Sequence, residues 1–294
     1  MSENNYINGD QYLSKKNLVY VNKKIISLEQ AGIPAADQGL LFGWGLFETL
    51  RIYNGMAHML DEHITRMIFS AKTLNISMPM NKEEIVGQVG QFIKAAEIEN
   101  SVLRITLTKG VNNISNIIFT HRPIVYTAQD YKRGFTAKIA SIRRNATSPL
   151  VFMKTLNYMD NMLAKQEANL SGFDEALLLN TQGKLCEGSM SNIFFVKNGR
   201  IHTPAVKCGL LPGIIRQLVI EKIAPFMNME VLQDEYGEMQ LFEADEAFIT
   251  NSVMQIMPLV AVNGVNIGNG MPGSVTLAVM RAYDDYVEMG FLFN

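Results

Sequence analysis

Hydrophobic residues recur along the chain with two periods, one typical of strands and one typical of helices. In the first half, alternating apolar and polar residues predict strands, whereas apolar residues three or four positions apart predict two helices. Residues 1–17 are expected to form a mobile arm or an extra strand. The expected strands are 18–21, 25–28, 47–53, 101–109 and two short segments around His121-Arg122-Pro123, and the expected helices are 61–74 and Asn81 to about Ala96.

The second half mixes the two patterns in the same irregular way. A polar stretch at 129–134 is expected to link two domains, 1–128 and 135–294, because 294 residues exceed a typical single core. Since strands and helices do not alternate strictly, the pattern predicts an α+β or irregular α/β fold rather than a doubly wound parallel sheet. The expected strands are 135–141, 175–180, 184–189, 192–197, 200–203 and two within 243–262, and the expected helices are 158–171, one opening at Pro212-Gly213, and 274–293.

Composition and charge exclude several classes of protein. A hydrophobic content of 48% with 18% charged residues is typical of a well-packed globular protein. The net charge of −2, without a basic run, argues against a nucleic-acid partner. No apolar stretch approaches about 18 residues and the N-terminus is polar, so neither a membrane span nor a signal peptide is expected. The two cysteines, Cys186 and Cys208, indicate a reduced, cytoplasmic protein, and the four histidines lack the spacing of a metal site, so no metal is expected.

A lysine and a glutamate in the second half carry the strongest chemical signal. Lys154 lies in an apolar patch just before Asn157 and Tyr158, and Glu187 lies on an expected strand beyond the next helix. A desolvated amine attacks an aldehyde, and a carboxylate beside a pyridine nitrogen keeps that nitrogen protonated, so the pair fits pyridoxal phosphate. Taken one at a time, the two residues are more typical of a solvated surface lysine and an exposed strand carboxylate, and the local sequence leaves that alternative open.

Donors suited to a phosphate group occur at three other places. The run LPGIIRQL predicts a helix that begins near Gly213, so that the backbone N–H groups of Ile214 and Ile215 favour an anion. Ser252 follows an expected strand and offers a hydroxyl, and Arg66 offers a charged donor. A plain turn, a capping serine and a surface arginine are the more common uses of these residues, and these alternatives also stay open.

Six runs, in a fixed order between about residues 18 and 290, make the chain resemble a known family. They are DQGLLFGWGLFETLRIY, HITRM, KTLNYMDNMLAKQEA, EGSMSNIFFVKNG, LPGIIR and ADEAFITNSVMQIMP. The chain thereby resembles the fold-type IV (class IV) pyridoxal-phosphate-dependent aminotransferases, which include branched-chain aminotransferases, D-amino acid aminotransferases and aminodeoxychorismate lyases.

The resemblance implies a role for each matching residue. Lys154 is implied to be the Schiff-base lysine and proton carrier, Glu187 the partner of the pyridinium nitrogen, and Tyr158 a hydrogen-bond partner of the cofactor's phenolic oxygen. The family also implies a small α/β domain, a larger pseudo-barrel domain with pyridoxal 5'-phosphate between the two, and a homodimer. The implied phosphate ligands are Arg66, the backbone of Ile214 and Ile215, and Ser252.

The resemblance leaves three activities open. The leading hypothesis is transfer of an amino group between an amino acid, branched-chain or similar, and a 2-oxo acid. The alternative is 4-amino-4-deoxychorismate lyase, which releases pyruvate and 4-aminobenzoate, and a third possibility is a non-catalytic relative that binds the cofactor. Arg104 or Lys109 is a candidate for binding a substrate carboxylate, although Arg104 equally fits a salt-bridged strand residue.

Overall fold

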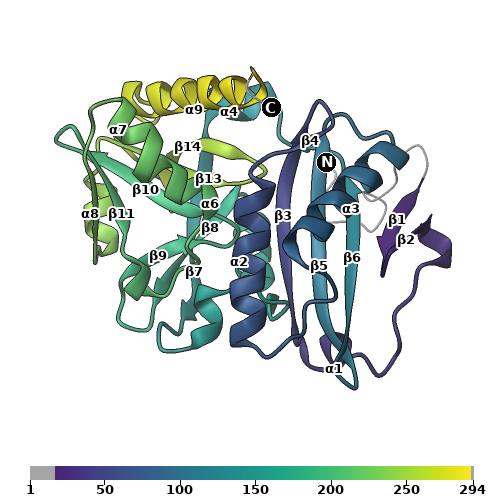
Figure 1. Cartoon of the computed structure of the whole chain (residues 1–294). Coiled ribbons are helices and arrows are strands. Elements are labelled where there is room, and N and C mark those ends of the chain that lie inside the picture. Colours follow the sequence, from purple (N-terminus) through teal and green to yellow (C-terminus); the bar gives the residue numbers. More distant parts are fainter. Residues whose placement is uncertain (1–16, 293–294) are drawn as a thin grey trace. The chain divides into compact units, whose positions relative to one another are not determined.

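The computed structural model describes residues 17–292 and divides the chain into two compact units (Figure 1). The first unit contains the residues up to Val125 together with Lys154–Asn157, and the second contains Tyr126–Met153 and the residues from Tyr158 onward. The boundary therefore lies before the predicted linker, and four residues around Lys154 belong to the first unit rather than to the second half. The arm or strand expected over residues 1–17 lies, except for its last residue, outside the described part of the chain.

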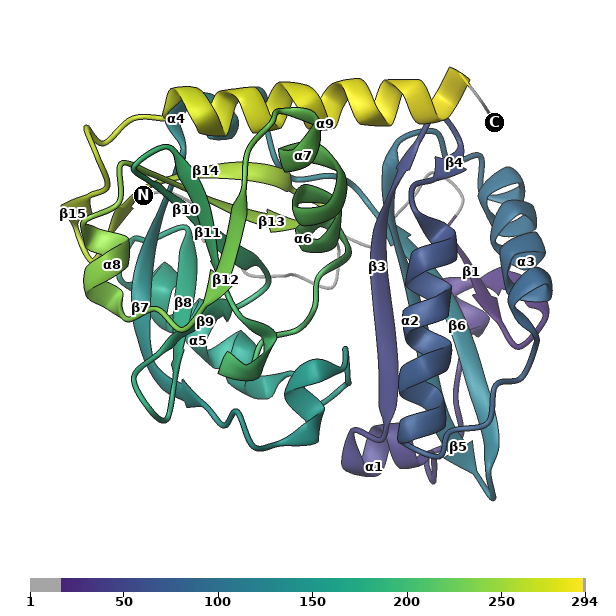
Figure 2. The same ribbon diagram turned by 60° about the vertical axis from the view of Figure 1, so that its left-hand side comes forward.

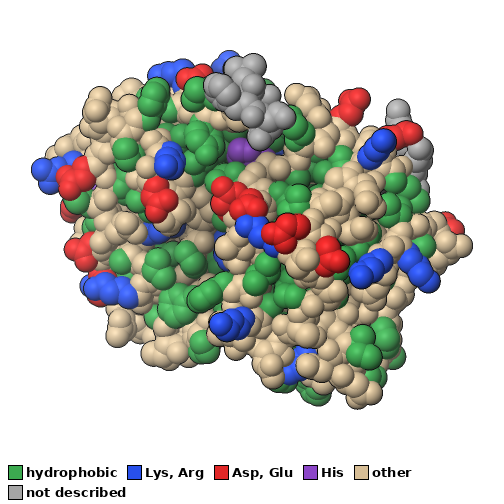
Figure 3. All heavy atoms as spheres, in the orientation of Figure 1, with side chains coloured by type: hydrophobic (Ala, Val, Ile, Leu, Met, Phe, Trp, Pro, Cys, Tyr) green, Lys and Arg blue, Asp and Glu red, His purple; other side chains and the backbone are tan. Residues whose placement is uncertain are grey.

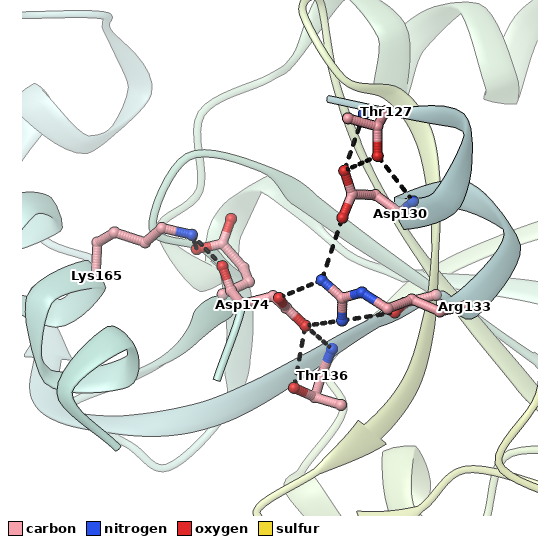
Figure 4. A network of polar contacts seen from close by, with 8 residues as sticks. Thr127, Asp130, Arg133, Thr136, Lys165 and Asp174 are labelled. Carbon is pink, nitrogen blue, oxygen red and sulfur yellow. Dashed lines mark hydrogen bonds and ion pairs between the residues drawn. The ribbon is translucent and has the colours of Figure 1, made fainter. Parts of the chain in front are cut away.

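The predicted linker is an ordered helix, α4 (Ala128–Arg133). Thr127 and Asp130 form a capping box at its N-terminus, which satisfies the first backbone N–H groups. At its other end Arg133 makes a two-pronged contact with Asp174, whose carboxylate also accepts from the backbone and hydroxyl of Thr136 (Figure 4). These bonds join α4 to β7 and to the residue before β8 in the second unit, so this polar stretch is ordered.

The first unit is a six-stranded antiparallel sheet with the strand order β2-β1-β6-β5-β3-β4. Helices α2 and α3 lie on one face of it (Figure 2). Its strands are β1 (Leu18–Val21), β2 (Lys24–Ser27), β3 (Gly45–Tyr53), β4 (Met56–Ala57), β5 (Ser101–Val111) and β6 (Ile114–Arg122). Its helices are the 3-10 turn η2 (Leu28–Gln30), α1 (Gln38–Phe42), α2 (Leu60–Thr73) and α3 (Lys82–Ala95).

Two strand predictions in this unit differ from the structure. The strand expected over 101–109 continues to Val111, and a two-residue turn at Asn112 and Asn113 joins it to β6. Both asparagines have positive φ, 51° and 64°, which is the backbone that a tight hairpin turn requires. Strand therefore also covers residues 110, 111 and 114–116, whereas residues 124–128, expected as the second of the two short strands, form no strand.

Alternation along β3 separates the two faces of the first sheet. Leu46, Leu50 and Ile52 are buried and pack toward the helices, where Ile64 of α2 and Phe92 of α3 are also buried. One polar residue, Glu48, shares this apolar face and is 1% exposed. A buried carboxylate in such a row needs a charged partner, and this requirement shapes the site described below.

The second unit is built on a mixed sheet with the strand order β12-β11-β10-β13-β14-β7-β8-β9, to which β15 adds by pairing with β14. Three neighbouring pairs are parallel, β11–β12, β14–β7 and β7–β8, and the others are antiparallel. The strands are β7 (Phe135–Arg144), β8 (Glu175–Asn180), β9 (Leu185–Gly188), β10 (Asn192–Lys197), β11 (Arg200–Pro204), β12 (Val231–Asp234), β13 (Glu246–Asn251), β14 (Gln255–Val262) and β15 (Val265–Asn266). The mixed topology confirms the predicted α+β or irregular α/β class.

Short helices connect these strands, and two longer helices pack on them. Besides α4, they are the 3-10 turns η3 (Pro149–Phe152) and η4 (Val206–Cys208), then α5 (Met159–Leu170), α6 (Ile214–Leu218), the π-helical segment η5 (Val219–Ile223), α7 (Ala224–Phe226), α8 (Glu238–Phe242) and α9 (Ser274–Leu292). Helix α5 packs on β7 and β8 through Ala164 and Ala168, both fully buried against Ala176 and Leu178. Small side chains at these positions let the helix approach the sheet closely.

The surface bears charges of both signs. On the face that Figure 3 shows, the Lys and Arg side chains are interspersed with Asp and Glu rather than gathered by sign. Within residues 17–292, no helix combines the length and the apolar character needed to cross a membrane.

Candidate functional site

The backbone around Lys154 is fixed to strand β3 of the first unit. Phe47 N–H donates to the Lys154 carbonyl at 2.9 Å, and Leu156 N–H donates to the Gly45 carbonyl at 2.9 Å. Gly45 permits this approach, because a Cβ there would lie 2.6 Å from a side-chain carbon of Leu156. The segment thus adds to the sheet as a short strand, and its hydrogen bonds set the position from which the Lys154 side chain leaves.

The Lys154 side chain lies on an aromatic ring that it shares with Arg104. Its Nζ is 4.4 Å from the centre of the Phe47 ring, and Arg104 Cζ is 3.9 Å from the same centre. Lys109, the other candidate for binding a substrate carboxylate, lies on a different ring, with Nζ 3.4 Å from the centre of the Trp44 ring. The structure therefore brings Lys154 and Arg104 together and places Lys109 apart from them.

Arg66, on α2, is held by the buried carboxylate of Glu48. Its Nε donates to one oxygen of Glu48 at 2.8 Å and its Nη2 to the other at 2.6 Å, while His63 Nδ1 lies 2.6 Å from the second oxygen. Burial alone would raise the pKa of Glu48, but the charge of Arg66 and the bond from His63 lower it to about 2. Burial lowers the pKa of His63, so this imidazole is neutral and Arg66 carries the charge of the cluster.

Tyr158 lies in the second unit, immediately before α5. Its hydroxyl donates to the Ser189 carbonyl at 3.0 Å, and the amide of Asn161, on the first turn of α5, donates to the same carbonyl at 2.6 Å. Ser189 is fully buried in the loop that follows β9, and its own hydroxyl donates to the buried carboxylate of Glu175. Both ends of this short loop are therefore fixed, which defines the position of the Tyr158 ring.

Glu187 is a buried carboxylate on β9 whose side chain is 6% exposed. One oxygen accepts from Arg144 Nη2, and the other accepts from the backbone N–H of Leu211 at 3.0 Å. Arg144, at the end of β7, also donates from Nη1 to Asn161 Oδ1 at 3.1 Å. Burial alone would lower the pKa of the Arg144 guanidinium, but the charge of Glu187 beside it raises that pKa above the usual arginine value. Glu187 is therefore an oriented and charged group.

The predicted phosphate donors of the second unit lie at two backbone turns. Gly213 caps α6 without a side-chain hydrogen bond, so the N–H groups of Ile214 and Ile215 belong to the helix end that has no intrahelical partner. A Cβ at Gly213 would lie 2.0 Å from Asn192 Oδ1, so a larger residue here would displace the Asn192 side chain. Ser252 lies in the turn after β13, where the Asn251 side chain accepts from the two N–H groups that follow Ser252.

The structure thus divides the predicted residues into two sets. Lys154, Arg66, Arg104 and Lys109 belong to the first unit, and the charges of Arg66 and Lys154 both lower the pKa of His63, which places them within electrostatic reach of it. The predicted residues of the second unit are Tyr158, Glu187, Ile214, Ile215 and Ser252.

Sequence reasoning missed the residues that orient these groups. Glu48 and His63 hold Arg66, and Arg144 and Asn161 hold Glu187 and the loop beneath Tyr158. For Glu48 a signal existed, because it is a charged residue at an inward position of the alternating run FETLRIY. Within the described residues, no group of three or more His, Cys, Asp or Glu side chains is arranged to hold a metal ion.

Comparison with known proteins gives matches over most of the chain. The family model described as amino-transferase class IV matches residues 45–262. A putative branched-chain-amino-acid aminotransferase of Methanocaldococcus jannaschii is 34% identical over 277 residues, which cover 91% of this chain and 95% of the relative. The aminodeoxychorismate lyase of Bacillus subtilis is 31% identical over 280 residues, which cover 92% and 95%.

The fold is also similar to that of solved structures. A branched-chain amino acid aminotransferase from T.th., complexed with N-(5'-phosphopyridoxyl)-L-glutamate, superposes with a TM-score of 0.85 at 28% identity. The match covers 92% of this chain and 93% of that one, so it includes both units.

Proposed function

Because this chain belongs to the class IV aminotransferases, as its sequence predicts, we propose that it transfers an amino group between a branched-chain or similar amino acid and a 2-oxo acid, with pyridoxal 5'-phosphate as its cofactor. The observation that carries the proposal is Glu187, a buried carboxylate whose two oxygens are fixed by Arg144 and by the Leu211 backbone. Such a group suits a protonated ring nitrogen, and the similar solved structure contains a phosphopyridoxyl group.

The other residues of the second unit suit the remaining parts of the cofactor. The uncapped start of α6, from which the helical run continues through η5 and α7, offers N–H groups to the phosphate at Ile214 and Ile215. Ser252 would add a hydroxyl, and Tyr158 would contact the phenolic oxygen. From the first unit, Arg66 would supply the charged donor for the phosphate, with Glu48 fixing the plane of its guanidinium.

Lys154 would be the group that moves the proton. When bound, pyridoxal phosphate supplies an aldehyde that takes up an amine and a ring that withdraws electrons from the substrate carbon. The neutral Lys154 amine would take the proton from the substrate α-carbon and return it one position away, which is general acid–base catalysis. The bond from Phe47 N–H to the Lys154 carbonyl and the bond from Leu156 N–H to the Gly45 carbonyl would hold the backbone from which the amine extends.

Arg104 would bind the substrate carboxylate. Its guanidinium lies on the Phe47 ring that Lys154 also contacts, and Nε donates to Thr106 Oγ1 at 3.1 Å. A planar guanidinium matches the geometry of a carboxylate and suits two-pronged binding of it. Lys109, on the Trp44 ring, is the weaker candidate because it lies away from Lys154.

A homodimer in the cytoplasm is part of the proposal. On α1, Leu40, Leu41 and Phe42 are exposed in succession, at 62%, 55% and 68%. Contiguous exposed apolar surface is typical of an interface, and a second copy of the chain is its proposed partner. The two cysteines, Cys186 and Cys208, are buried free thiols, which agrees with a reducing compartment.

The alternative is aminodeoxychorismate lyase, which one observation favours: the Bacillus subtilis enzyme of that name is nearly as similar, at 31% identity against 34% for the aminotransferase relative. A panel of L- and D-amino acids with 2-oxoglutarate, assayed beside aminodeoxychorismate, separates the two. Amino transfer to 2-oxoglutarate is the expected result. Release of pyruvate with an aromatic amine, and no amino transfer, would reject the first proposal.

The cofactor is tested separately from the substrate. The purified protein is expected to be yellow, and Lys154→Ala is expected to lose the visible absorption that responds to amino acids. Lys165→Ala is the matched control, since Lys165 lies on α5 and donates to the Asp174 backbone. A wild-type protein that binds no pyridoxal phosphate would reject the cofactor assignment.

A further inference from the structure

A chain of hydrogen bonds in the second unit links Glu187 to Tyr158. It runs from Glu187 to Arg144, from Arg144 to Asn161, and from Asn161 to the Ser189 carbonyl that also accepts the Tyr158 hydroxyl. The links come from β7, α5 and the loop after β9, so three elements that are distant in sequence are joined. Arg144 is the charged donor among these links and touches Glu187 directly.

The position of Arg144 determines where a proton shared with Glu187 resides. A guanidinium next to a carboxylate makes that carboxylate a weaker base, because protonation would leave the guanidinium without its counter-charge. If Glu187 shares a proton with the pyridine nitrogen of the cofactor, this proton therefore lies closer to the nitrogen than to the carboxylate. The Arg144 side chain is 15% exposed, so water screens this effect little.

We propose that Arg144 is a positioning residue that acts through Glu187: it fixes the carboxylate and keeps the shared proton on the ring nitrogen of the cofactor. This inference rests on the proposed function, because it requires that pyridoxal phosphate is bound at Glu187. The bond from Nη1 to Asn161 fixes the guanidinium plane, so Arg144 cannot turn away from the carboxylate.

Other ionisable groups lie around Glu187, and their charges also act on its carboxylate. They are Tyr158 at the start of α5, Cys186 on β9, Cys208 in η4 and Arg216 on α6. Burial raises the pKa of both thiols, and burial lowers the pKa of Arg216 only to about 10. The thiols therefore stay neutral near neutral pH, while Arg216 stays charged there, and Arg144 differs from Arg216 in that it bonds to Glu187 directly.

The test is NMR of the holoenzyme reconstituted with pyridoxal phosphate that carries a labelled ring nitrogen. The wild type is expected to show a protonated nitrogen, Arg144→Met a signal displaced toward the neutral form, and Arg144→Lys a largely protonated one. Arg143→Met is the matched control, because this neighbouring side chain leaves the opposite face of β7 and donates to the Ala140 carbonyl. We expect about a 10- to 100-fold loss of kcat in Arg144→Met with little change in KM.

If Arg144→Met does not fold, the double variant Arg144→Met/Glu187→Gln tests whether Arg144 acts through Glu187, because it removes both buried charges together. If Arg144 acts through Glu187, its kcat lies within about threefold of Glu187→Gln alone. A further tenfold loss, or an Arg144→Met holoenzyme whose nitrogen signal and kcat equal those of Arg143→Met, would overturn the inference. A wild-type chain that binds no cofactor would instead overturn the proposed function, so the two failures differ.

Discussion

The buried carboxylate of Glu48 offers the sharpest test of how the first unit is stabilised. Its pKa is lowered from 4.5 to about 2, because the charge of Arg66 and the bond from His63 outweigh the effect of burial. The perturbation is Glu48→Gln, which keeps the shape of the side chain and removes its charge. A neutral glutamine accepts hydrogen bonds from Arg66 and His63 less strongly than a carboxylate does. The variant is therefore expected to be less stable than the wild type at neutral pH.

The size of the effect follows from the displacement of the pKa. At about 1.4 kcal/mol for each pKa unit, a displacement from 4.5 to about 2 stabilises the folded state by about 3 kcal/mol. Because the folded-state pKa is the lower one, this stabilisation is fully present above pH 4.5 and is lost as the pH falls through about 2. About 2 kcal/mol of it is already lost near pH 3.

The assay uses the single tryptophan of the chain, Trp44, which belongs to the same unit as Glu48. Its Nε1 donates to the Leu74 carbonyl at the end of α2, so its fluorescence reports on unfolding of this unit. Urea unfolding is followed from pH 5 down to pH 2 in the wild type and in Glu48→Gln. The control is Glu62→Gln, an exposed carboxylate on the same helix as Arg66.

The expected result is a free energy of unfolding that falls more steeply with acid in the wild type than in Glu48→Gln. Protonation of the buried His63 also destabilises both proteins, and this loss is larger in Glu48→Gln because Glu48 raises the pKa of His63, so a steeper fall in the wild type reports on Glu48. Parallel curves for the wild type and Glu48→Gln would refute the argument, since Glu48 would then not be the group whose protonation is linked to folding.

Three further predictions concern other positions. Gly213→Ala is expected to weaken pyridoxal phosphate binding at least tenfold, because its Cβ would lie 2.0 Å from Asn192 Oδ1; titration of the apoenzyme measures this, and unchanged affinity would contradict it. Gly87→Ala, inside α3 with open space around it, is expected to stabilise the first unit by about 0.5–1 kcal/mol in the Trp44 assay. Glu175→Ala is expected to cost about 3 kcal/mol by calorimetry, because two serine hydroxyls and a backbone N–H lose their acceptor, whereas Glu175→Gln should cost less.

Most elements of the fold follow from local patterns, and the exceptions have physical causes. The helix after Lys154 and the strands on either side of Gly183 carry clear periodicity and turn residues, and the structure contains them. The polar run 129–134 is largely helix α4, and its Arg133 pairs with Asp174, which directly precedes β8, a contact that no local pattern contains. The membership of Lys154 in the first unit likewise depends on hydrogen bonds to β3, a strand that lies about a hundred residues earlier.

The candidate site likewise combines residues that the sequence points to with residues that only the fold brings together. Residues such as Lys154 and Glu187 could be proposed as cofactor contacts from the sequence because their chemistry is specific. The residues that orient them, such as Arg144 and Asn161, belong to common residue types, and only the meeting of β7, α5 and β9 gives them a role. Periodicity predicts which face of an element is buried, but it does not predict which polar residues on different elements will become partners.

Each unit contains one buried carboxylate that is paired with a less buried arginine. The side chains are 2% and 14% exposed for Glu48 and Arg66, and 6% and 15% exposed for Glu187 and Arg144. Apolar residues in place of a buried ion pair are often neutral or stabilising, so stability alone does not explain either pair. In the first unit the carboxylate orients the arginine, whose charge suits a phosphate. In the second the arginine orients the carboxylate, whose charge suits a ring nitrogen. If the proposed function holds, removal of either orienting partner, Glu48 or Arg144, is expected to impair cofactor binding or turnover even where the fold survives.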